Sequence, residues 1–216
     1  AFMTPERRAD GHGPSLRGNV LPMDLHLPDA RVHWHRHWLA SPAADALQRT
    51  LREDVPWEVH KIRMFGRQVD SPRLSCWMGD PAARYRYSGT DFVPHAWHPA
   101  LLPLCAQLAT FCGARFNSVL LNRYRDGDDG MGWHSDNEPE LGPEPVIASL
   151  SLGAERRFAL RRREDHNRKA EVTLGHGDLL VMAGATQRLY QHALPKSARV
   201  MGERINLTFR WITPGT

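Results

Sequence analysis

Residues 204–211, Arg-Ile-Asn-Leu-Thr-Phe-Arg-Trp, alternate strictly between polar and apolar side chains. Successive side chains of a β-strand point to opposite faces, so this stretch is predicted to be a strand with one polar and one apolar face. The same period of two begins after Phe116 and predicts five more strands: Ser118–Tyr124, Val146–Leu152, Phe158–Arg161, Ala170–Leu174 and Asp178–Met182. Many short strands separated by turn residues indicate a barrel or a sandwich.

Two helices are predicted ahead of these strands. Ser41 is expected to cap the first helix, with Pro42 at its first helical position. The second helix is predicted from about Pro99 to Cys112. Its buried stripe is expected to comprise Leu101, Leu104, Cys105, Leu108, Phe111 and Cys112. Helices followed by strands favour an α+β fold, with the N-terminal helices packed outside a jelly roll.

The length and composition of the chain predict one soluble domain. Residues 1–20 are rich in Gly, Pro and charge, so we expect a flexible tail followed by a single domain over residues 21–216. No apolar run suggests a membrane span or a signal peptide. The three cysteines form no CxxC motif and suit a reducing compartment. We therefore expect a monomer that is not secreted, cytoplasmic in a bacterium or nuclear in a eukaryote.

The net charge of +4 is compatible with a polyanionic partner but does not require one. Arg156 to Lys169 is a more strongly basic segment, although a solvated strand–loop–strand face would look the same. His33, His35 and His37 alternate as on a strand, and an exposed strand face is a better explanation for them than a metal site.

His134-Ser-Asp136 and the later His192 are candidate metal ligands. Two imidazoles and one carboxylate can occupy one face of an octahedral iron, as in non-haem Fe(II) oxygenases. The His-x-Asp spacing fits the end of an extended strand, where residues i and i+2 point to the same side. A His and an Asp paired only by a hydrogen bond, or a zinc hydrolase with these ligands, are the alternatives.

Arg204 and Arg210 strengthen the iron hypothesis. Planar guanidinium groups bind carboxylates in a bidentate manner, and a dicarboxylate co-substrate needs a cation near each end. The candidate metal triad and these two arginines together therefore predict a 2-oxoglutarate-dependent oxygenase. A surface row of salt bridges is the alternative for the arginines, and a zinc hydrolase would leave them unexplained.

Four motifs in this order resemble those of the AlkB family of nucleic-acid dealkylases: Asn122-Arg-Tyr124, His134-Ser-Asp136, His192 and Arg204-Ile-Asn206-Leu-Thr208-Phe-Arg210. The resemblance covers roughly Leu21 to Ile212 and is closest to the branch that prefers double-stranded DNA. It implies a double-stranded β-helix (jelly-roll) core at about 116–212 and a nucleotide-recognition lid at about 57–92.

The same resemblance implies a role for each site residue. His134, Asp136 and His192 would hold Fe(II), with O2 and 2-oxoglutarate as co-substrates. Arg204 would bind the distal carboxylate of 2-oxoglutarate, and Arg210 would lie beside the carboxylate that chelates iron. Further hydrogen bonds to the co-substrate would come from Asn122, Tyr124, Asn206 and Thr208; a polar strand edge is the alternative for these four.

On the substrate side, the resemblance places Tyr85, Tyr87 and Ser88 in the lid, where the tyrosines would frame a flipped base. Edge-strand aromatics packed on the core are the alternative. Glu138 matches an acidic position that contacts the base, and a carboxylate suits the cationic 1-methyladenine or 3-methylcytosine. Asn137 stands where the closest branch has an acid, which leaves its share of base recognition open.

Met64-Phe65-Gly66-Arg67 matches a hairpin finger of that branch, in which an apolar side chain fills the gap left by a flipped base. A core phenylalanine beside a turn is the alternative. Phosphate contacts are expected from Arg161, Arg162, Arg163, Arg168, Lys169, Lys196 and Arg199.

Taken together, the resemblance implies oxidative demethylation of 1-methyladenine, 3-methylcytosine and, by extension, etheno adducts, with release of formaldehyde, succinate and CO2. The partner would be alkylated DNA, with duplex favoured over single strands or RNA. One alternative is a 2-oxoglutarate oxygenase acting on RNA, protein or a small molecule. Another is an inactive relative that only binds DNA.

Overall fold

The computed structural model describes residues 22–64, 67–87, 90–200 and 202–213, and it does not describe the side chains of 62–68 and 85–92. The expected tail at residues 1–20 and the expected substrate contacts Phe65, Gly66 and Ser88 lie outside the described residues.

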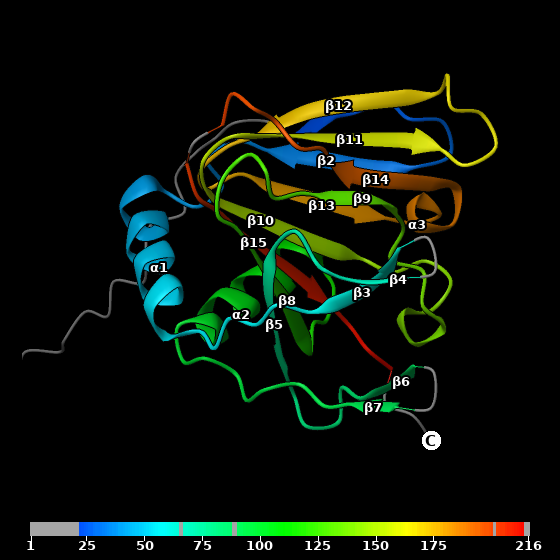
Figure 1. Ribbon diagram of the computed structural model, residues 1–216. Helices are drawn as coiled ribbons and strands as arrows, with labels where there is room; N and C mark the ends of the chain where they lie inside the picture. Colours follow the sequence, from blue (N-terminus) through cyan, green and yellow to red (C-terminus); the bar gives the residue numbers. More distant parts are fainter. Residues whose placement is uncertain (1–21, 65–66, 88–89, 201, 214–216) are drawn as a thin grey trace, which may run out of the picture.

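Two antiparallel sheets form the core (Figure 1). The larger sheet has the order β1-β2-β13-β10-β15-β8-β5, and the smaller has the order β12-β11-β14-β9. The larger sheet comprises β1 (Met23–Asp24), β2 (Arg31–His35), β13 (Leu179–Ala183), β10 (Ile147–Gly153), β15 (Arg204–Arg210), β8 (Ser118–Tyr124) and β5 (Leu74–Gly79). The smaller sheet comprises β12 (Lys169–Leu174), β11 (Arg156–Arg162), β14 (Tyr190–Leu194) and β9 (Met131–His134). Buried side chains of both sheets, such as Met182 and Leu160, form one cluster between them, as in a jelly roll.

The helices α1 (Ser41–Asp54) and α2 (Leu101–Cys112) pack outside the larger sheet. Leu51 of α1 and Leu104 of α2 join one buried cluster with Leu207 of β15. The predicted α+β jelly roll with external helices is therefore confirmed.

Strand β15 pairs with β10 on one side and β8 on the other. Ile205, Leu207 and Phe209 are fully buried in the cluster that includes the helices. The alternate residues from Arg204 to Arg210 face the smaller sheet, where the pocket lies. The strict alternation of residues 204–210 thus places an apolar face on the helices and a polar face in the interior of the jelly roll.

The range expected for the lid contains three different structures. Two-stranded ribbons are formed by β3 (Lys61–Met64) with β4 (Arg67–Asp70), and by β6 (Tyr85–Tyr87) with β7 (Thr90–Phe92). Between them, β5 pairs with β8 and belongs to the larger sheet. The core therefore extends beyond residues 116–212, because Leu74–Gly79 is drawn into the sheet at its edge.

Two details of the predicted helices were wrong. Ser41 does not cap α1: Ala40 is the N-cap residue, no side chain bonds there, and Pro42 lies in the first turn. Phe111 is 45% exposed. The buried face of α2 is formed by Leu101, Leu104 and Leu108, and Phe111 instead contacts the edges of two aromatic rings, His35 and Trp38.

The three cysteines are free thiols. Cys76 is buried, and Cys105 and Cys112 are partly buried against the same cluster. Burial raises the pKa of each thiol to about 11, which is the behaviour of structural rather than reactive cysteines. No helix among the described residues is long and apolar enough to cross a bilayer.

Candidate active site

Strand pairing in the smaller sheet brings the three predicted metal ligands together. His134 ends β9 and pairs directly with His192 of β14, and Asp136 follows two residues after His134. Their ligand atoms all lie within 4.8 Å of one another. Within the described residues this is the one cluster of three or more His, Cys, Asp or Glu side chains with metal-binding spacing, so the strand at His33 and His35 holds none.

Hydrogen bonds around the triad fix the orientation of its ligands. The Nδ1 atom of His134 lies 2.9 Å from the carbonyl oxygen of Gly132. A carbonyl oxygen only accepts, so Nδ1 carries the proton and Nε2 is left as the metal-binding atom. The backbone N–H of Asp136 donates to Oε1 of buried Gln187 over 3.0 Å. Sequence reasoning missed Gln187, because the partner of a backbone amide has no sequence signature.

Asp136 is a buried carboxylate with three cationic or polar neighbours. Its Oδ2 lies 3.0 Å from Nη2 of Arg210, and its Oδ1 lies 3.9 Å from Nε2 of His134. Burial alone would raise the pKa of Asp136, but its interaction with Arg210, with smaller contributions from the His192 and His134 rings, outweighs burial and leaves the pKa below its ordinary value. The carboxylate is therefore held ionised, which is the form that binds a metal.

His192 is kept neutral. Burial, with a smaller contribution from His134, lowers the pKa of His192 to about 3. Its ring lies 4.2 Å from the His134 ring, between centroids, and stacks on Phe158 at 5.3 Å. Two imidazoles and one ionised carboxylate form the donor set expected for Fe(II), so the residues present fit the metal.

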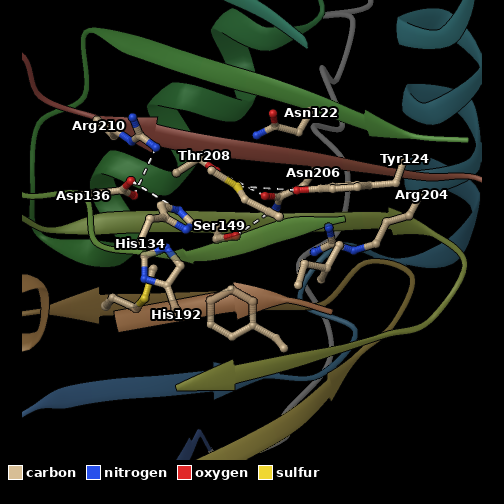
Figure 2. A pocket seen from close by; sticks show the side chains of 14 residues that line it. Asn122, Tyr124, His134, Asp136, Ser149, His192, Arg204, Asn206, Thr208 and Arg210 are labelled. Atoms are coloured by element: carbon tan, nitrogen blue, oxygen red, sulfur yellow. Dashed lines mark hydrogen bonds and ion pairs between the residues drawn. The ribbon is translucent and has the colours of Figure 1, made fainter. Parts of the chain in front are cut away.

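Arg204 lies at the far end of the same pocket, away from the metal ligands (Figure 2). The side chain is 2% exposed. Its Nη2 donates to Ser151 Oγ over 2.8 Å, while its Nε has no hydrogen-bond partner. Burial lowers the pKa of Arg204 to about 10. A buried guanidinium with an unsatisfied N–H fits the carboxylate of a ligand.

Polar side chains of three strands line the pocket between these two ends (Figure 2). Asn206 donates to Ser149 Oγ over 2.9 Å, and Thr208 donates to Asn206 Oδ1 over 3.2 Å. On β8, Asn122 pairs in register with Asn206, and Tyr124 pairs with Arg204. Asn122 Oδ1 accepts a hydrogen bond from Arg73 Nε over 2.9 Å.

All nine predicted metal and co-substrate residues line this one pocket, together with several that were not predicted. Ser149 could have been found, because it alternates with apolar residues in the predicted strand Val146–Leu152. Apolar residues complete the wall: Met131, Phe158, Met182 and Leu194. They look like ordinary core residues in the sequence.

A second cavity of about 310 Å³ shares Asn122 and Arg210 with the first pocket. Its other lining residues include Glu138, Arg73 and Trp77. Glu138 is exposed and contributes to the wall, whereas Asn137 is exposed and lines neither cavity. Tyr85 and Tyr87 lie on β6, and Arg67 lies on β4.

The predicted phosphate contacts have different environments. Arg163, Arg168, Lys169, Lys196 and Arg199 are exposed. Arg168 pairs with Asp165 at 3.3 Å. Arg162 points away from Arg161 and pairs with Asp29 at 2.9 Å, with only 16% of its side chain exposed. Arg161 donates through Nε and Nη2 to Gln191 Oε1.

Comparison with known proteins places this site in a family. Residues 31–210 match the family model described as the 2OG-Fe(II) oxygenase superfamily. The chain is 41% identical over 179 residues to alpha-ketoglutarate-dependent dioxygenase alkB homolog 3 of Bos taurus, covering 79% of this chain and 62% of that protein. It is 35% identical over 219 residues to DNA oxidative demethylase ALKBH2 of Homo sapiens, covering 96% of this chain and 83% of that protein.

The solved structure of OsALKBH1 has the same fold, with a TM-score of 0.59 and 17% identity over 88% of this chain and 99% of that one. The match of the family model spans the metal ligands and both arginines. The chain therefore belongs to the 2OG-Fe(II) oxygenase superfamily and, within it, to the AlkB group.

Proposed function

We propose that the protein is an Fe(II)- and 2-oxoglutarate-dependent dioxygenase that oxidatively demethylates alkylated DNA bases. The observation that carries the proposal is a pair of cavities that share two lining residues. One holds the metal triad and Arg204 with its unsatisfied Nε–H, and the other is large enough for a base and shares Asn122 and Arg210 with the first. A flipped base in the second cavity would bring its N-methyl group beside the metal ligands.

The protein residues have separate tasks in this reaction. His134, Asp136 and His192 would hold Fe(II), which supplies the oxidation of the N-methyl carbon with O2 and 2-oxoglutarate. Arg204 would bind the distal carboxylate of 2-oxoglutarate through its unsatisfied Nε–H. Asn206, Thr208 and Tyr124 would set the orientation of the co-substrate along β15 and β8. The products would be the unmodified base, formaldehyde, succinate and CO2.

The substrate would be 1-methyladenine or 3-methylcytosine in DNA, with etheno adducts as further substrates. The names of the relatives support this assignment, because ALKBH2 of Homo sapiens is called a DNA oxidative demethylase. We propose duplex DNA as the preferred partner and a monomer as the active form. Exposed Lys169, Lys196 and Arg199 would contact phosphates without selecting sequence.

The test is mass spectrometry on matched single- and double-stranded oligonucleotides that carry one 1-methyladenine. With Fe(II) and 2-oxoglutarate present, we expect a loss of about 14 Da from the modified strand, and no loss when either is omitted. Steady succinate formation without a mass change would overturn the DNA assignment while leaving an active oxygenase. RNA and protein would then be the next substrates to test.

Glu138→Gln is expected to discriminate between lesions. Glu138 lines the second cavity, where a cationic base would gain a charge-assisted hydrogen bond from its carboxylate. We expect kcat/KM to fall about tenfold on 1-methyladenine, and much less on the neutral 1,N6-ethenoadenine. Asn137→Gln, beside it and outside both cavities, is the matched control. Equal losses on both lesions would contradict a charge-based role for Glu138.

Phe65→Ala tests the preference for duplex DNA. Strands β3 and β4 pair as far as Met64 and Arg67, the residues on either side of Phe65-Gly66. If Phe65 enters the base stack, its loss should lower activity on duplex DNA by about tenfold or more and leave single strands nearly unaffected. The ratio of the two rates, measured on the same lesion, is the readout. A ratio equal to that of the unmodified enzyme would show that Phe65 is a packing residue.

A further inference from the structure

Trp133, Gln191 and Arg161 form a row across the outer face of the smaller sheet. Residues paired across antiparallel strands point to the same side, and neighbours along a strand point to opposite sides. His134 pairs with His192 toward the pocket, so Trp133 and Gln191, the residues just before them, face outward. Arg161 pairs with Gln191 and shares that outer face. We call these three residues the outer row.

Arg161 is held in place without having its charge neutralised. Its Nε and Nη2 donate to Gln191 Oε1 over 3.1 and 3.0 Å. Three nearby arginines have carboxylate partners: Arg157 pairs with Glu171, Arg162 with Asp29 and Arg168 with Asp165. Across the described part of the chain, no carboxylate forms an ion pair with Arg161. A fixed, uncompensated guanidinium is suited to an anion from outside the protein.

Trp133 supplies a flat apolar surface at the same place. The residue is 40% exposed, although indole is among the side chains that gain most from burial. The guanidinium carbon of Arg161 lies 4.1 Å from the centroid of the Trp133 ring, which is cation–π contact. Lys169, which pairs in register with Arg161, adds an exposed cation to this face. Glu171, two residues after Lys169, is paired with Arg157, whose Nη1 lies 3.2 Å from its Oε1.

An aromatic ring beside a fixed guanidinium matches one ligand chemistry. A nucleobase stacks on an aromatic side chain regardless of sequence, and a phosphate accepts hydrogen bonds from a guanidinium. The spacing also suits a nucleotide, because the stacking surface and the cation are in contact with each other. A peptide or a lipid surface would match the cation but would not need the ring.

We propose that the outer row is a second nucleotide subsite, in which an unpaired base of the substrate strand stacks on Trp133 and its phosphate binds Arg161. The proposal rests on the proposed function and adds a contact outside the cavity that holds the reacting base. Gln191 is a positioning residue, since it orients Arg161 and leaves Nη1 free for the phosphate. The subsite would add this contact wherever a nucleotide beside the lesion is unpaired.

The experiment is a scan with abasic nucleotides. A single-stranded oligonucleotide carrying one 1-methyladenine is prepared with an abasic site at each flanking position in turn, and binding is measured by fluorescence anisotropy with Fe(II) and the inactive co-substrate analogue N-oxalylglycine. In the unmodified protein, we expect one flanking position at which loss of the base weakens binding about tenfold. In Trp133→Ala, we expect the intact strand to bind about tenfold more weakly than it binds the unmodified protein. Loss of the base at that flanking position should then have no further effect on binding.

Three further variants separate stacking from general effects. Trp133→Phe keeps an aromatic ring and should retain most of the binding and the positional effect. Arg161→Lys keeps the charge but loses the planar contact with the ring and the two bonds to Gln191, so it should show a partial loss. Phe111→Ala, at an aromatic residue of similar exposure on α2, is the control and should bind as the unmodified protein does.

Two results would overturn the subsite. One is an abasic scan of Trp133→Ala that matches the unmodified protein, and the other is equal loss in Trp133→Phe and Trp133→Ala. Failure of the proposed function is visible separately, because the unmodified enzyme would then not demethylate the intact oligonucleotide. If the unmodified enzyme demethylates the oligonucleotide but the abasic scan of Trp133→Ala matches its own, the proposed function is retained and the subsite is rejected.

Discussion

His134→Ala is expected to abolish measurable demethylation and succinate formation, a loss of at least about 10³-fold in turnover. The substitution removes one of three ligand side chains whose donor atoms lie within 4.8 Å of one another. Asp136 and His192 would remain, but two ligands do not define one face of an octahedral metal. Fe(II) affinity should fall together with activity. Both quantities can be measured on the same preparation, by metal titration and by succinate assay.

Ser135→Ala is the matched control for this variant. Ser135 lies between the two ligands, yet its Oγ donates to the carbonyl oxygen of Tyr190 over 2.7 Å rather than facing the metal. We expect Ser135→Ala to keep Fe(II) affinity and most of its turnover. Because the side chain of His134 is 26% exposed, its removal should leave the thermal midpoint of unfolding nearly unchanged. A His134→Ala enzyme with near-normal demethylation would rule out the iron assignment.

The predictability of this site from sequence differs between its two halves. The row from Arg204 to Arg210 occupies a single strand, so alternation alone determined which residues share a face. His134, in contrast, was expected only at the end of an extended strand without stated bounds, and no strand was predicted around His192. Strand β9 is four residues long and contains Gly132, and β14 directly follows the short helix α3 (Thr186–Leu189). Such short segments carry too few residues for a period to be recognised.

Tertiary partners account for the other differences. Gln187 accepts a hydrogen bond from the backbone amide of Asp136, and Ser151 accepts one from the buried guanidinium of Arg204. Neither contact has a signature in the local sequence. Strand β5 becomes part of the larger sheet because β8 offers an open edge, which its own sequence does not reveal. Phe111 has the helical spacing of a core residue, but it packs against the rings of His35 and Trp38 and stays 45% exposed. The spacing of apolar residues determines which side chains share a face of a helix or strand, whereas tertiary packing determines which of these faces are covered.

Arg204→Met is expected to raise the KM for 2-oxoglutarate by about 100-fold or more, with a smaller effect on kcat at saturation. Arg204 is the buried cation at the end of the pocket away from the metal, and its Nε has no partner in the protein. A ligand carboxylate bonded to a buried guanidinium is a desolvated pair, and loss of one partner of such a pair costs about 3–5 kcal/mol. Steady-state succinate kinetics with varied 2-oxoglutarate would measure the change.

The same substitution should not destabilise the protein without 2-oxoglutarate. Burial lowers the pKa of Arg204, which means that the fold disfavours its charged form until a carboxylate arrives. Met has a similar length and no charge to desolvate. The thermal midpoint of unfolding of Arg204→Met should therefore equal or exceed that of the unmodified protein. Adding 2-oxoglutarate should then stabilise the unmodified protein and leave Arg204→Met unchanged. Arg157→Met, which removes an exposed arginine paired with Glu171, should behave as the unmodified protein in both assays. A lower midpoint in Arg204→Met, with an unchanged KM, would make Arg204 a structural residue and leave the co-substrate without its distal cation.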